Sequence, residues 1–563
     1  MSRTFASEFL EAYQEIPDQV AIVLQQQGLP DLPLTYKKLF EGAAGFSSAL
    51  EQAGLQPGEV VILILPHGEA LLYAFWGAIL HGAIPSIMPF LTEKLSPESY
   101  RRSLRALFEV TAPAAAITYT EFVSEVSQAI PEGSSVRTVL DAGIVQPCVH
   151  IDQDRLGGLN MATGEIVLLQ HTSGTTGLQK GVALSHRAVI NQIESYATAI
   201  RLDQKDVIVS WLPLYHDMGL IAGFILPVLR RIPLVLSSPF DWVRSPASLL
   251  ASISRYRGSL TWLPNFAYNF CAQKIRSRDL EGLDLSSWRA VINCSEPMHW
   301  RSHDLFLERF QPYGLNPQAL ATCYAMAENV FAVTQGGIDT PVHLDVIDQA
   351  SFLSKGVARP CSPGLPEMKL LSAGVPIAGT QVRVLDNNRL ELPERRLGEI
   401  AIRSDYLLNG YYNRPDLNAA AFSDGWYLTG DLGYLAEGEL YITGRKKDLI
   451  IVGGKNIYPQ DLERLASEVE GIHPGRVVAF GVFNEQVGTE EVVLVAEADE
   501  LVPGSSGSEH AEALADQVRR HITRSSEIAL RYVQIVERGW LLKTSSGKVA
   551  RNANREKYLQ GVN

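Results

Sequence analysis

The chain contains little cysteine. Five cysteines are scattered over 563 residues, and no two of them are spaced as Cys-x-x-Cys. This pattern argues against a disulfide framework and against a metal site built from thiolates. We therefore expect free thiols in a reducing compartment, namely the cytoplasm. The cysteines are Cys148, Cys271, Cys294, Cys323 and Cys361.

Basic residues are fewer than acidic residues. Lys and Arg total 49 against 62 Asp and Glu, so the formal net charge is -13. Phosphate backbones attract basic surfaces, so a nucleic-acid partner is not expected. Nucleotide binding is still compatible with this balance, because a single nucleotide needs only a local positive pocket.

Uninterrupted apolar runs of membrane-spanning length are missing as well. Residues 71–91 are apolar, but His81, Gly82 and Pro85 divide the stretch into pieces too short to cross a bilayer. We predict a buried helix over residues 69–80, followed by a strand or turn over residues 83–89. The first residues lack the apolar run of a signal peptide, so no membrane span is expected.

The length and the order of apolar segments predict an α/β enzyme of two or more domains. Apolar residues make up 46% and charged residues 20% of the chain, as in ordinary globular proteins. Short apolar strands alternate with helices, which is typical of parallel sheets covered on both faces. The predicted strands are residues 60–65, 114–118 and 207–212, and the predicted helices are residues 69–80 and 185–200. Closely spaced strands follow at residues 398–403, 439–443 and 448–452.

The most informative motif is Leu-Leu-Gln-His-Thr-Ser-Gly-Thr-Thr-Gly-Leu-Gln-Lys-Gly at residues 168–181. A predicted strand over residues 166–169 runs into hydroxyl groups, glycines and a lysine. Such a loop can hold a polyphosphate, because glycines allow close backbone approach and the other side chains donate hydrogen bonds. An ordinary turn after a strand is the alternative. The candidate ligand-binding residues are Thr172, Ser173, Gly174, Thr175, Thr176, Gly177 and Lys180.

This loop resembles the nucleotide-binding signature of the adenylate-forming superfamily, with Gln179 where proline is usual. That superfamily includes acyl-CoA synthetases, fatty acyl-AMP ligases, luciferases and peptide-synthetase adenylation domains. Five further motifs stand in the family's order. The resemblance implies a large N-terminal domain of mostly parallel sheets with a distorted barrel, and a small mobile C-terminal α+β lid. It places the domains at residues 1–445 and 446–563, with Lys447 as the hinge between them.

Residues 211–220, Trp-Leu-Pro-Leu-Tyr-His-Asp-Met-Gly-Leu, resemble the substrate gate of fatty acyl-AMP ligases. His216 is a candidate catalytic donor to the carboxylate or to the forming acyl phosphate. A packed histidine in an aromatic cluster is the alternative. Asp217 admits another interpretation, in which a buried carboxylate holds the ammonium group of an amino acid.

Two motifs resemble the family's adenine and metal contacts. In the first, Ser295, Glu296 and Pro297 follow a predicted strand, and the family's backbone lies along the adenine there. In the second, the resemblance implies that Tyr324 stacks on adenine and that Glu328 binds Mg²⁺, together with Thr172. Ala325, in place of the usual glycine, and Met326 complete the predicted nucleotide-binding segment.

Two later motifs complete the resemblance. Asp431, in Thr-Gly-Asp, and Arg445 are implied as the ribose contacts. Lys548, in Ser-Ser-Gly-Lys, is implied as the catalytic lysine that offsets charge on the α-phosphate. A solvated basic tail is the alternative interpretation of this region, and it fits residues 551–557 better than Lys548. Lys543 is interpreted as a decoy or a secondary contact.

Among the branches of the family, the sequence is most similar to fatty acyl-AMP ligases. The His-Asp-Met-Gly motif and an extra segment over residues 337–370 favour that branch, although an ordinary surface loop is the alternative for the segment. The resemblance implies that ATP and Mg²⁺ activate a fatty acid to acyl-AMP with release of pyrophosphate. The acyl group then passes to the phosphopantetheine thiol of an acyl carrier protein. An acyl-CoA synthetase, an amino-acid adenylation enzyme and a catalytically inactive binding protein are the alternatives.

Overall fold

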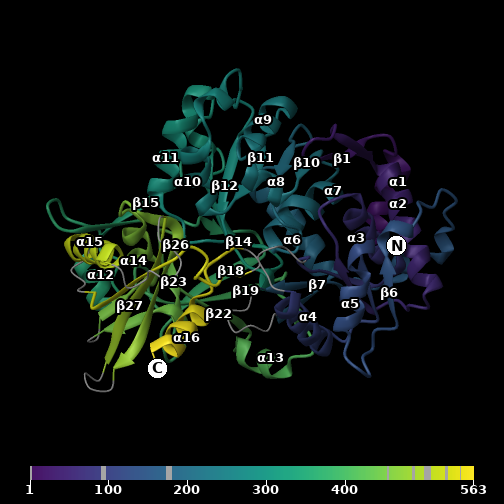
Figure 1. Cartoon of the computed structure of the whole chain (residues 1–563). Coiled ribbons are helices and arrows are strands. Elements are labelled where there is room, and N and C mark those ends of the chain that lie inside the picture. The colour runs from purple at the N-terminus through teal and green to yellow at the C-terminus, as the bar shows by residue number, and fades with distance from the viewer. Residues whose placement is uncertain are drawn as a thin grey trace.

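The computed structural model describes residues 3–90, 97–172, 180–452, 455–484, 489–499, 509–525, 530–544 and 547–562. Its helices and strands alternate through the first half of the chain, as the sequence predicts (Figure 1). The helices are α1 (Phe5–Glu15), α2 (Tyr36–Gln52), α3 (Glu69–His81), α4 (Pro97–Thr111), α5 (Val123–Ala129), α6 (His186–Ala199), α7 (Leu226–Arg230), α8 (Pro239–Arg244), α9 (Ala247–Tyr256), α10 (Asn265–Lys274), α11 (Trp300–Phe310), α12 (Gln349–Lys355), α13 (Pro415–Ala421), α14 (Pro459–Ser467), α15 (Glu509–Ser525) and α16 (Arg551–Val562).

A nine-stranded sheet forms the centre of the N-terminal domain, in the order β17-β14-β13-β12-β11-β9-β10-β1-β2. Its six inner strands from β13 to β1 are mutually parallel, and the strands at both edges are antiparallel. Inner strands such as β12 are buried along their whole length, which explains why their residues are mostly apolar. The bounds are β1 (Val20–Gln25), β2 (Leu32–Thr35), β9 (Ile208–Ser210), β10 (Leu234–Ser237), β11 (Leu260–Leu263), β12 (Ala290–Cys294), β13 (Leu320–Ala325), β14 (Ala332–Gly336) and β17 (Val375–Pro376).

A second, four-stranded parallel sheet lies beside a three-stranded antiparallel one. The first has the order β4-β3-β5-β6 and the second the order β20-β8-β7. Contacts between β4 and β7 bring the two sheets together. Their bounds are β3 (Val60–Ile64), β4 (Ile84–Ile87), β5 (Ala115–Thr118), β6 (Thr138–Asp141), β7 (Ile166–Thr172), β8 (Lys180–Ser185) and β20 (Gly410–Tyr411).

The apolar stretch at residues 71–91 is a helix and a strand, as predicted. Helix α3 is buried almost all round and ends at Gly82, whose φ of 88° is a left-handed C-cap. Strand β4 follows and pairs with β3. Within the described parts of the chain, no helix combines the length and the apolarity that a membrane span requires.

An antiparallel five-stranded sheet completes the N-terminal domain and corresponds to the predicted barrel portion. It contains β18 (Thr380–Leu385), β19 (Gly398–Ser404), β21 (Phe422–Ser423), β22 (Trp426–Ala436) and β23 (Glu439–Arg445). The turn between β22 and β23 has positive φ at Glu437 and Gly438, 55° and 78°. Positive φ at both central residues is the geometry of a tight hairpin turn.

The extra segment at residues 337–370 is not an ordinary surface loop. It contains strand β15 (Leu344–Asp348), helix α12 and strand β16 (Glu367–Leu371), and the two strands pair in antiparallel register. Ile347 and Phe352 from this segment are buried together with Tyr434 of β22 and Tyr458, which precedes α14. The alternative interpretation as a loop is therefore wrong. Three prolines in the segment are typical of a loop, but the segment forms a short strand-helix-strand unit.

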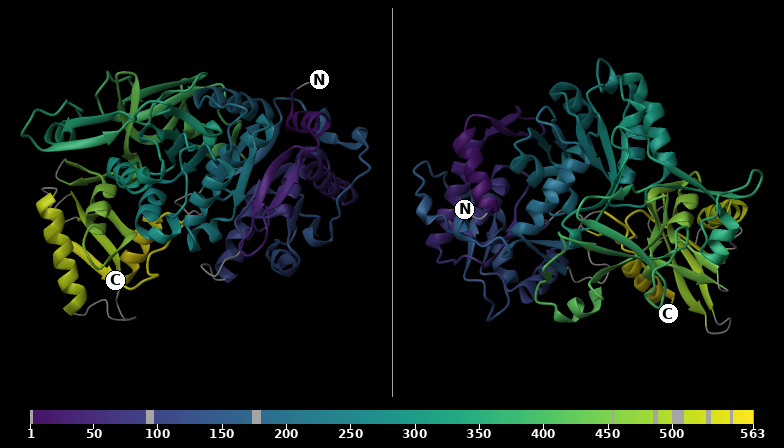
Figure 2. Two further views of the ribbon diagram at one scale, coloured as in Figure 1. Left: turned by 90° about the horizontal axis from the view of Figure 1, so that it is seen from above. Right: turned by 180° about the vertical axis from the view of Figure 1, so that it is seen from behind.

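The C-terminal elements build a separate hydrophobic core. A sheet of β26 (Ile472–Asn484), β27 (Thr489–Ala498) and β28 (Tyr532–Val536) packs against α14 and α15. A small hairpin of β24 (Ile450–Val452) and β25 (Lys455–Ile457) precedes them. Figure 2 shows these elements, in lime to yellow, gathered on one side of the molecule and away from the purple N-terminal end. The predicted α/β fold with a small C-terminal α+β domain is confirmed.

Candidate active site

The candidate site begins where two parallel strands of the central sheet end. β12 and β13 are neighbours in register, with Cys294 opposite Cys323. Ser295, which follows Cys294, and Tyr324, which follows Cys323, therefore lie at the same edge of the sheet. The carboxyl edge of a parallel sheet is the usual position of a ligand site in α/β folds.

Tyr324, Asp431 and Arg445 form one cluster, although they come from three strands. The Tyr324 hydroxyl donates to Asp431 Oδ2 over 2.6 Å, and Arg445 Nε lies 3.1 Å from Asp431 Oδ1. The register of β22 and β23 places Asp431 opposite Arg445. Burial, and then the charge of Asp431, raise the pKa of Tyr324 well above its usual value, so the phenol stays a neutral donor. The structure thus brings together the residues predicted to bind adenine and ribose.

Glu328 lies in a neighbouring polar cluster. Its Oε1 accepts a hydrogen bond from the Tyr411 hydroxyl over 2.8 Å, and the Tyr411 and Tyr427 hydroxyls lie 2.8 Å apart. Lys180 Nζ stands 5.0 Å from the centre of the Tyr411 ring. Pairing of β20 with β8 produces this arrangement, because it carries Tyr411 to the base of the Thr/Gly loop. The end of that loop and the predicted metal ligand are therefore close to the same tyrosine.

The Thr/Gly loop itself falls largely outside the described residues. This applies to Ser173, Gly174, Thr175, Thr176 and Gly177. The ends of the loop are described: Thr172, the last residue of β7, pairs with Lys180, the first of β8. The strand expected over residues 166–169 is therefore longer than predicted, and it returns through β8 as a hairpin.

Lys548 reaches this site from the C-terminal domain. Its Nζ donates to the Ser295 carbonyl oxygen over 2.5 Å, across 253 positions of the chain. Ser295 has a φ of 67°, a left-handed conformation that is uncommon for residues other than glycine. Strained backbone of this kind is concentrated at functional sites. Ser295 is also the first residue of the segment predicted to lie along adenine, so Lys548 contacts that segment directly.

The rest of that segment lies beside Lys548 or continues β13. Glu296 Oε2 accepts from the Phe266 backbone N–H over 3.0 Å, and burial raises the pKa of its carboxyl. Pro297 follows Glu296 directly. Ala325 ends β13, and the Met326 N–H donates to the Phe331 carbonyl over 2.9 Å. Both predicted segments therefore lie at the ends of the neighbouring strands β12 and β13.

His216 and Asp217 precede an unusual helix, η5 (Met218–Ile225), whose hydrogen bonds follow the π pattern. π-helical segments are rare and are frequently found at functional sites. Burial, and then the charge of Lys548, lower the pKa of His216 to about 3, so the imidazole is neutral. Burial raises the pKa of Asp217. The charge of Lys548 acts on both residues, since it lowers the pKa of Asp217 as well, against the larger effect of burial.

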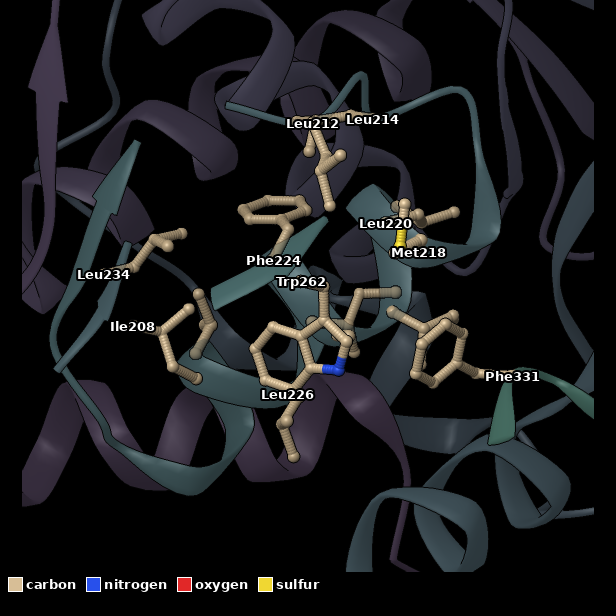
Figure 3. Packing of buried hydrophobic residues seen from close by; sticks show 14 of the residues in the cluster. Ile208, Leu212, Leu214, Met218, Leu220, Phe224, Leu226, Leu234, Trp262 and Phe331 are labelled. Atoms are coloured by element: carbon tan, nitrogen blue, oxygen red, sulfur yellow. The ribbon is translucent and has the colours of Figure 1, made fainter. Parts of the chain in front are cut away.

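Helix η5 belongs to a large apolar cluster. Figure 3 shows Trp262 of β11 among apolar side chains that include Ile208 of β9 and Phe224 of η5. Trp262 is 1% exposed, and its indole N–H donates to the Tyr196 hydroxyl over 2.7 Å. Met218 and Phe331 belong to the same core. Apolar residues of the predicted gate motif are therefore part of the hydrophobic core.

The predicted hinge lies directly after Arg445. Lys447 is the middle residue of a single turn, Lys446–Asp448, that follows β23. Burial, and then the neighbouring charge of Arg445, lower the pKa of Lys447. Lys446 is bonded to Glu399 of β19 over 2.8 Å. The chain therefore passes from the N-terminal to the C-terminal elements within a few residues of Arg445.

Three residues of this region were missed by sequence reasoning. Tyr411 and Tyr427 gave no signal, because their roles depend on pairing between strands far apart in sequence. Arg551 was interpreted as part of a solvated basic tail. That interpretation is wrong for Arg551, whose side chain is only 14% exposed and pairs with Asp448 and Glu463.

Comparisons with known proteins agree with the fold and with the family resemblance. The family model for AMP-binding enzymes matches residues 9–412. The chain is 33% identical over 525 residues to 4-hydroxyphenylalkanoate adenylyltransferase of Mycobacterium tuberculosis, covering 89% of this chain and 82% of the relative. It is 30% identical to the long-chain-fatty-acid–AMP ligase FadD26 of Mycobacterium bovis, covering 99% and 97%.

Solved structures show the same architecture over the whole chain. A structure of the fatty acyl-adenylate ligases of E. coli and L. pneumophila superposes with a TM-score of 0.89 at 26% identity, covering 99% of this chain and 98% of the other. The McyG A-PCP structure complexed with phenylalanyl-adenylate gives 0.85 at 25% identity, covering 100% and 84%. The fold and the relatives are those of an adenylate-forming ligase. The chain belongs to the AMP-binding enzyme family.

Proposed function

We propose that this enzyme activates a fatty acid with ATP to a fatty acyl-AMP, releases pyrophosphate, and passes the acyl group to the phosphopantetheine thiol of a carrier protein. The observation that carries the proposal is the contact of Lys548 with the Ser295 carbonyl. It puts a cation from the C-terminal domain at the sheet edge where Tyr324, Asp431 and Arg445 gather. The fatty substrate is supported by the named activities of FadD26 and of the fatty acyl-adenylate ligases.

In the proposed site, the nucleotide lies across the β12 and β13 edge. Tyr324 stacks on adenine above the Ser295–Pro297 and Ala325–Met326 backbone, and Asp431 and Arg445 hold the ribose. The loop at residues 172–180 holds the phosphates. Lys548 then offsets the charge that builds on the α-phosphate as the carboxylate oxygen attacks phosphorus and pyrophosphate leaves.

His216 acts in this scheme as a neutral donor at the carboxylate. Since burial and Lys548 lower its pKa to about 3, the imidazole carries no charge at neutral pH. A neutral ring can donate one hydrogen bond without attracting the carboxylate into a tight ion pair. His216 thereby orients the attacking oxygen while leaving it nucleophilic.

Mg²⁺ is the proposed metal, held by Glu328 and Thr172. A carboxylate is the kind of oxygen ligand that this ion prefers. Among the described residues no group of three or more His, Cys, Asp or Glu side chains could enclose a metal. The ion would therefore take most of its ligands from phosphates and water, which is how Mg²⁺ is usually bound with nucleotides. When bound, it neutralises phosphate charge.

The domain boundary and the hinge are part of the same proposal. We place the N-terminal ATP- and acid-binding domain at residues 1–445, the lid at residues 446–563, and the pivot at Lys447. The separate hydrophobic core after Ile450 supports a lid that moves as one body. Rotation at Lys447 would withdraw Lys548 from Ser295 and open the acyl-AMP to a thiol. Five free cysteines are compatible with the reducing cytoplasm that we propose as the setting.

A carrier-protein thiol is preferred over CoA because of the strand-helix-strand unit at residues 344–371. Its Phe352 ring stacks on Tyr458 at 6.1 Å between ring centres. Helix α12 also contacts β25. These contacts bind the unit to the lid in the present arrangement and oppose rotation to another one. CoA as acceptor is the second candidate, since a relative at 32% identity is named a putative fatty-acid–CoA ligase, FadD21.

An amino-acid substrate is less well supported. It would need Asp217 as a carboxylate to hold the ammonium group. Burial raises the pKa of that carboxyl, with Glu328 adding to the effect. An ammonium group there would have to be desolvated beside the positive charge of Lys548, which already acts on Asp217.

The test is a panel of acids with ATP and Mg²⁺, scored for pyrophosphate release with and without CoA. We expect release with fatty acids, accumulation of acyl-AMP, and little acyl-CoA. Lys548→Ala should lower the rate by roughly 10²–10³. Lys37→Ala, which removes an exposed lysine at the start of α2, is the matched control. Acyl-CoA forming faster than acyl-AMP accumulates would assign the second candidate, and release only with amino acids would reject both.

A further inference from the structure

The hairpin that carries Lys548 is fastened at both ends. Before it, Lys543 Nζ donates to the Gly475 carbonyl over 3.2 Å. Within it, Thr544 N–H donates to the Lys548 carbonyl over 2.7 Å. After it, helix α16 begins at Arg551, three positions beyond Lys548. The hairpin itself is exposed at Lys548, so its position depends on these anchors.

Of these anchoring residues, Arg551 makes the most side-chain hydrogen bonds. Its Nη1 donates to Asp448 Oδ2 over 2.6 Å, and its Nη2 to Glu463 Oε1 over 2.7 Å. Its Nε donates to the Ala479 carbonyl over 2.9 Å. All three nitrogens of the guanidinium are thus used, in a position where the side chain is 14% exposed. A rigid fork with three acceptors fixes both the place and the orientation of the helix start.

The acceptors connect this helix start to the hinge. Asp448 is the last residue of the Lys446–Asp448 turn and follows Lys447 directly. Glu463 lies on α14, and its Oε1 also accepts from the Ala479 N–H of β26 over 2.9 Å. The guanidinium therefore joins three parts of the lid: the hinge turn, helix α14 and strand β26 of the lid sheet.

We propose that Arg551 is a positioning residue for the adenylation step. It fixes the Lys548 hairpin to the hinge turn, so that Lys548 moves with the pivot as part of one rigid body. Arg551 does not contact the reactants, and it acts only through Lys548. The inference rests on the proposed function, because it needs Lys548 to act at the α-phosphate.

The test measures acid-dependent pyrophosphate release by the full-length enzyme and its variants. We expect Arg551→Met to lower kcat by about 10²-fold, because a displacement of about 1 Å in a catalytic group can cost that much. KM for ATP and for the acid should stay near the wild-type values, since Lys548 acts in the transition state and not in substrate binding. Arg555→Met is the matched control. It lies one turn further along α16 and donates to the Gly481 carbonyl, over 3.0 Å, so its kcat should be unchanged.

A double variant separates positioning from a general structural role. If Arg551 acts through Lys548, then Arg551→Met adds nothing to Lys548→Ala, and the double variant has the kcat of Lys548→Ala alone. A further fall in the double variant, or a wild-type kcat for Arg551→Met, would overturn the inference. Should Arg551→Met not fold, Arg551→Lys serves in its place, because one ammonium cannot satisfy three fixed acceptors. A wild-type enzyme that releases no pyrophosphate with any acid would instead refute the proposed function.

Discussion

Tyr324 offers a prediction in which two roles of one side chain can be separated. Its hydroxyl bonds Asp431 over 2.6 Å, and its ring is proposed to stack on adenine. Tyr324→Phe removes the hydroxyl and keeps the ring. A hydrogen bond to a charged group contributes about 1.5–3 kcal/mol, but Asp431 retains Arg445 at 3.1 Å. We therefore expect KM for ATP to rise by about tenfold, near the lower end of that range.

Tyr324→Ala removes the ring as well. Stacking of a base on an aromatic side chain contributes about 1–3 kcal/mol, which corresponds to a further rise in KM of roughly 5- to 150-fold. The assay is ATP-dependent pyrophosphate release at saturating acid. Tyr434→Phe is the control: it loses a hydrogen bond of 2.9 Å to Asp345, and KM for ATP should not change. Equal KM values for Tyr324→Phe and Tyr324→Ala would refute the stacking role.

Three further predictions concern pH, the metal and the acceptor. Burial lowers the pKa of His303 from 6.5 to about 4. The unfolded chain therefore binds the proton at a higher pH than the folded chain, and the free energy of unfolding falls as the pH drops below 6.5. In urea titrations, His303→Gln should reduce the loss of unfolding free energy between pH 7 and pH 5 by about 2 kcal/mol. Glu328→Gln should raise the Mg²⁺ concentration needed for half-maximal pyrophosphate release. Tyr411→Phe, which removes the 2.8 Å hydrogen bond to Glu328, should raise that concentration less. The same Mg²⁺ concentration for wild type and Glu328→Gln would exclude Glu328 as a metal ligand. Phe352→Ala should remove the contact with Tyr458 that holds the lid and thereby increase acyl-CoA formation. The substitution should cost about 3–5 kcal/mol in local stability. Unchanged acyl-CoA formation in a folded variant would contradict the proposal that this contact restrains the lid.

Much of the fold could be predicted from the sequence, because its signals are local. Continuous apolar segments such as residues 60–65 predicted buried strands, and the glycine after α3 marks the end of that helix. The motif residues were also found locally, since the nucleotide-binding family keeps them in short segments. Strand ends were less accurate: β7 extends to Thr172, because its pairing with β8 continues into the loop.

The partners of the motif residues could not be predicted in the same way. Tyr411 meets Glu328 only because β20 adds to β8, more than two hundred positions away. Arg551 looked like a tail residue because its acceptors, Asp448 and Glu463, lie about one hundred positions earlier. Non-local pairing and buried ion pairs leave no periodic pattern in the sequence. Prolines likewise hid the strand-helix-strand unit around Phe352.

The central claim is that one ATP is held between the ribose cluster of the N-terminal domain and Lys548 of the lid. The most direct measurement is a crystal structure with a non-hydrolysable fatty acyl-adenosine sulfamate. We predict that the ribose hydroxyls bind Asp431, and that Lys548 Nζ leaves the Ser295 carbonyl to bind a sulfamate oxygen. A ligand bound in another cavity, or at this edge with its ribose away from Asp431, would contradict the account.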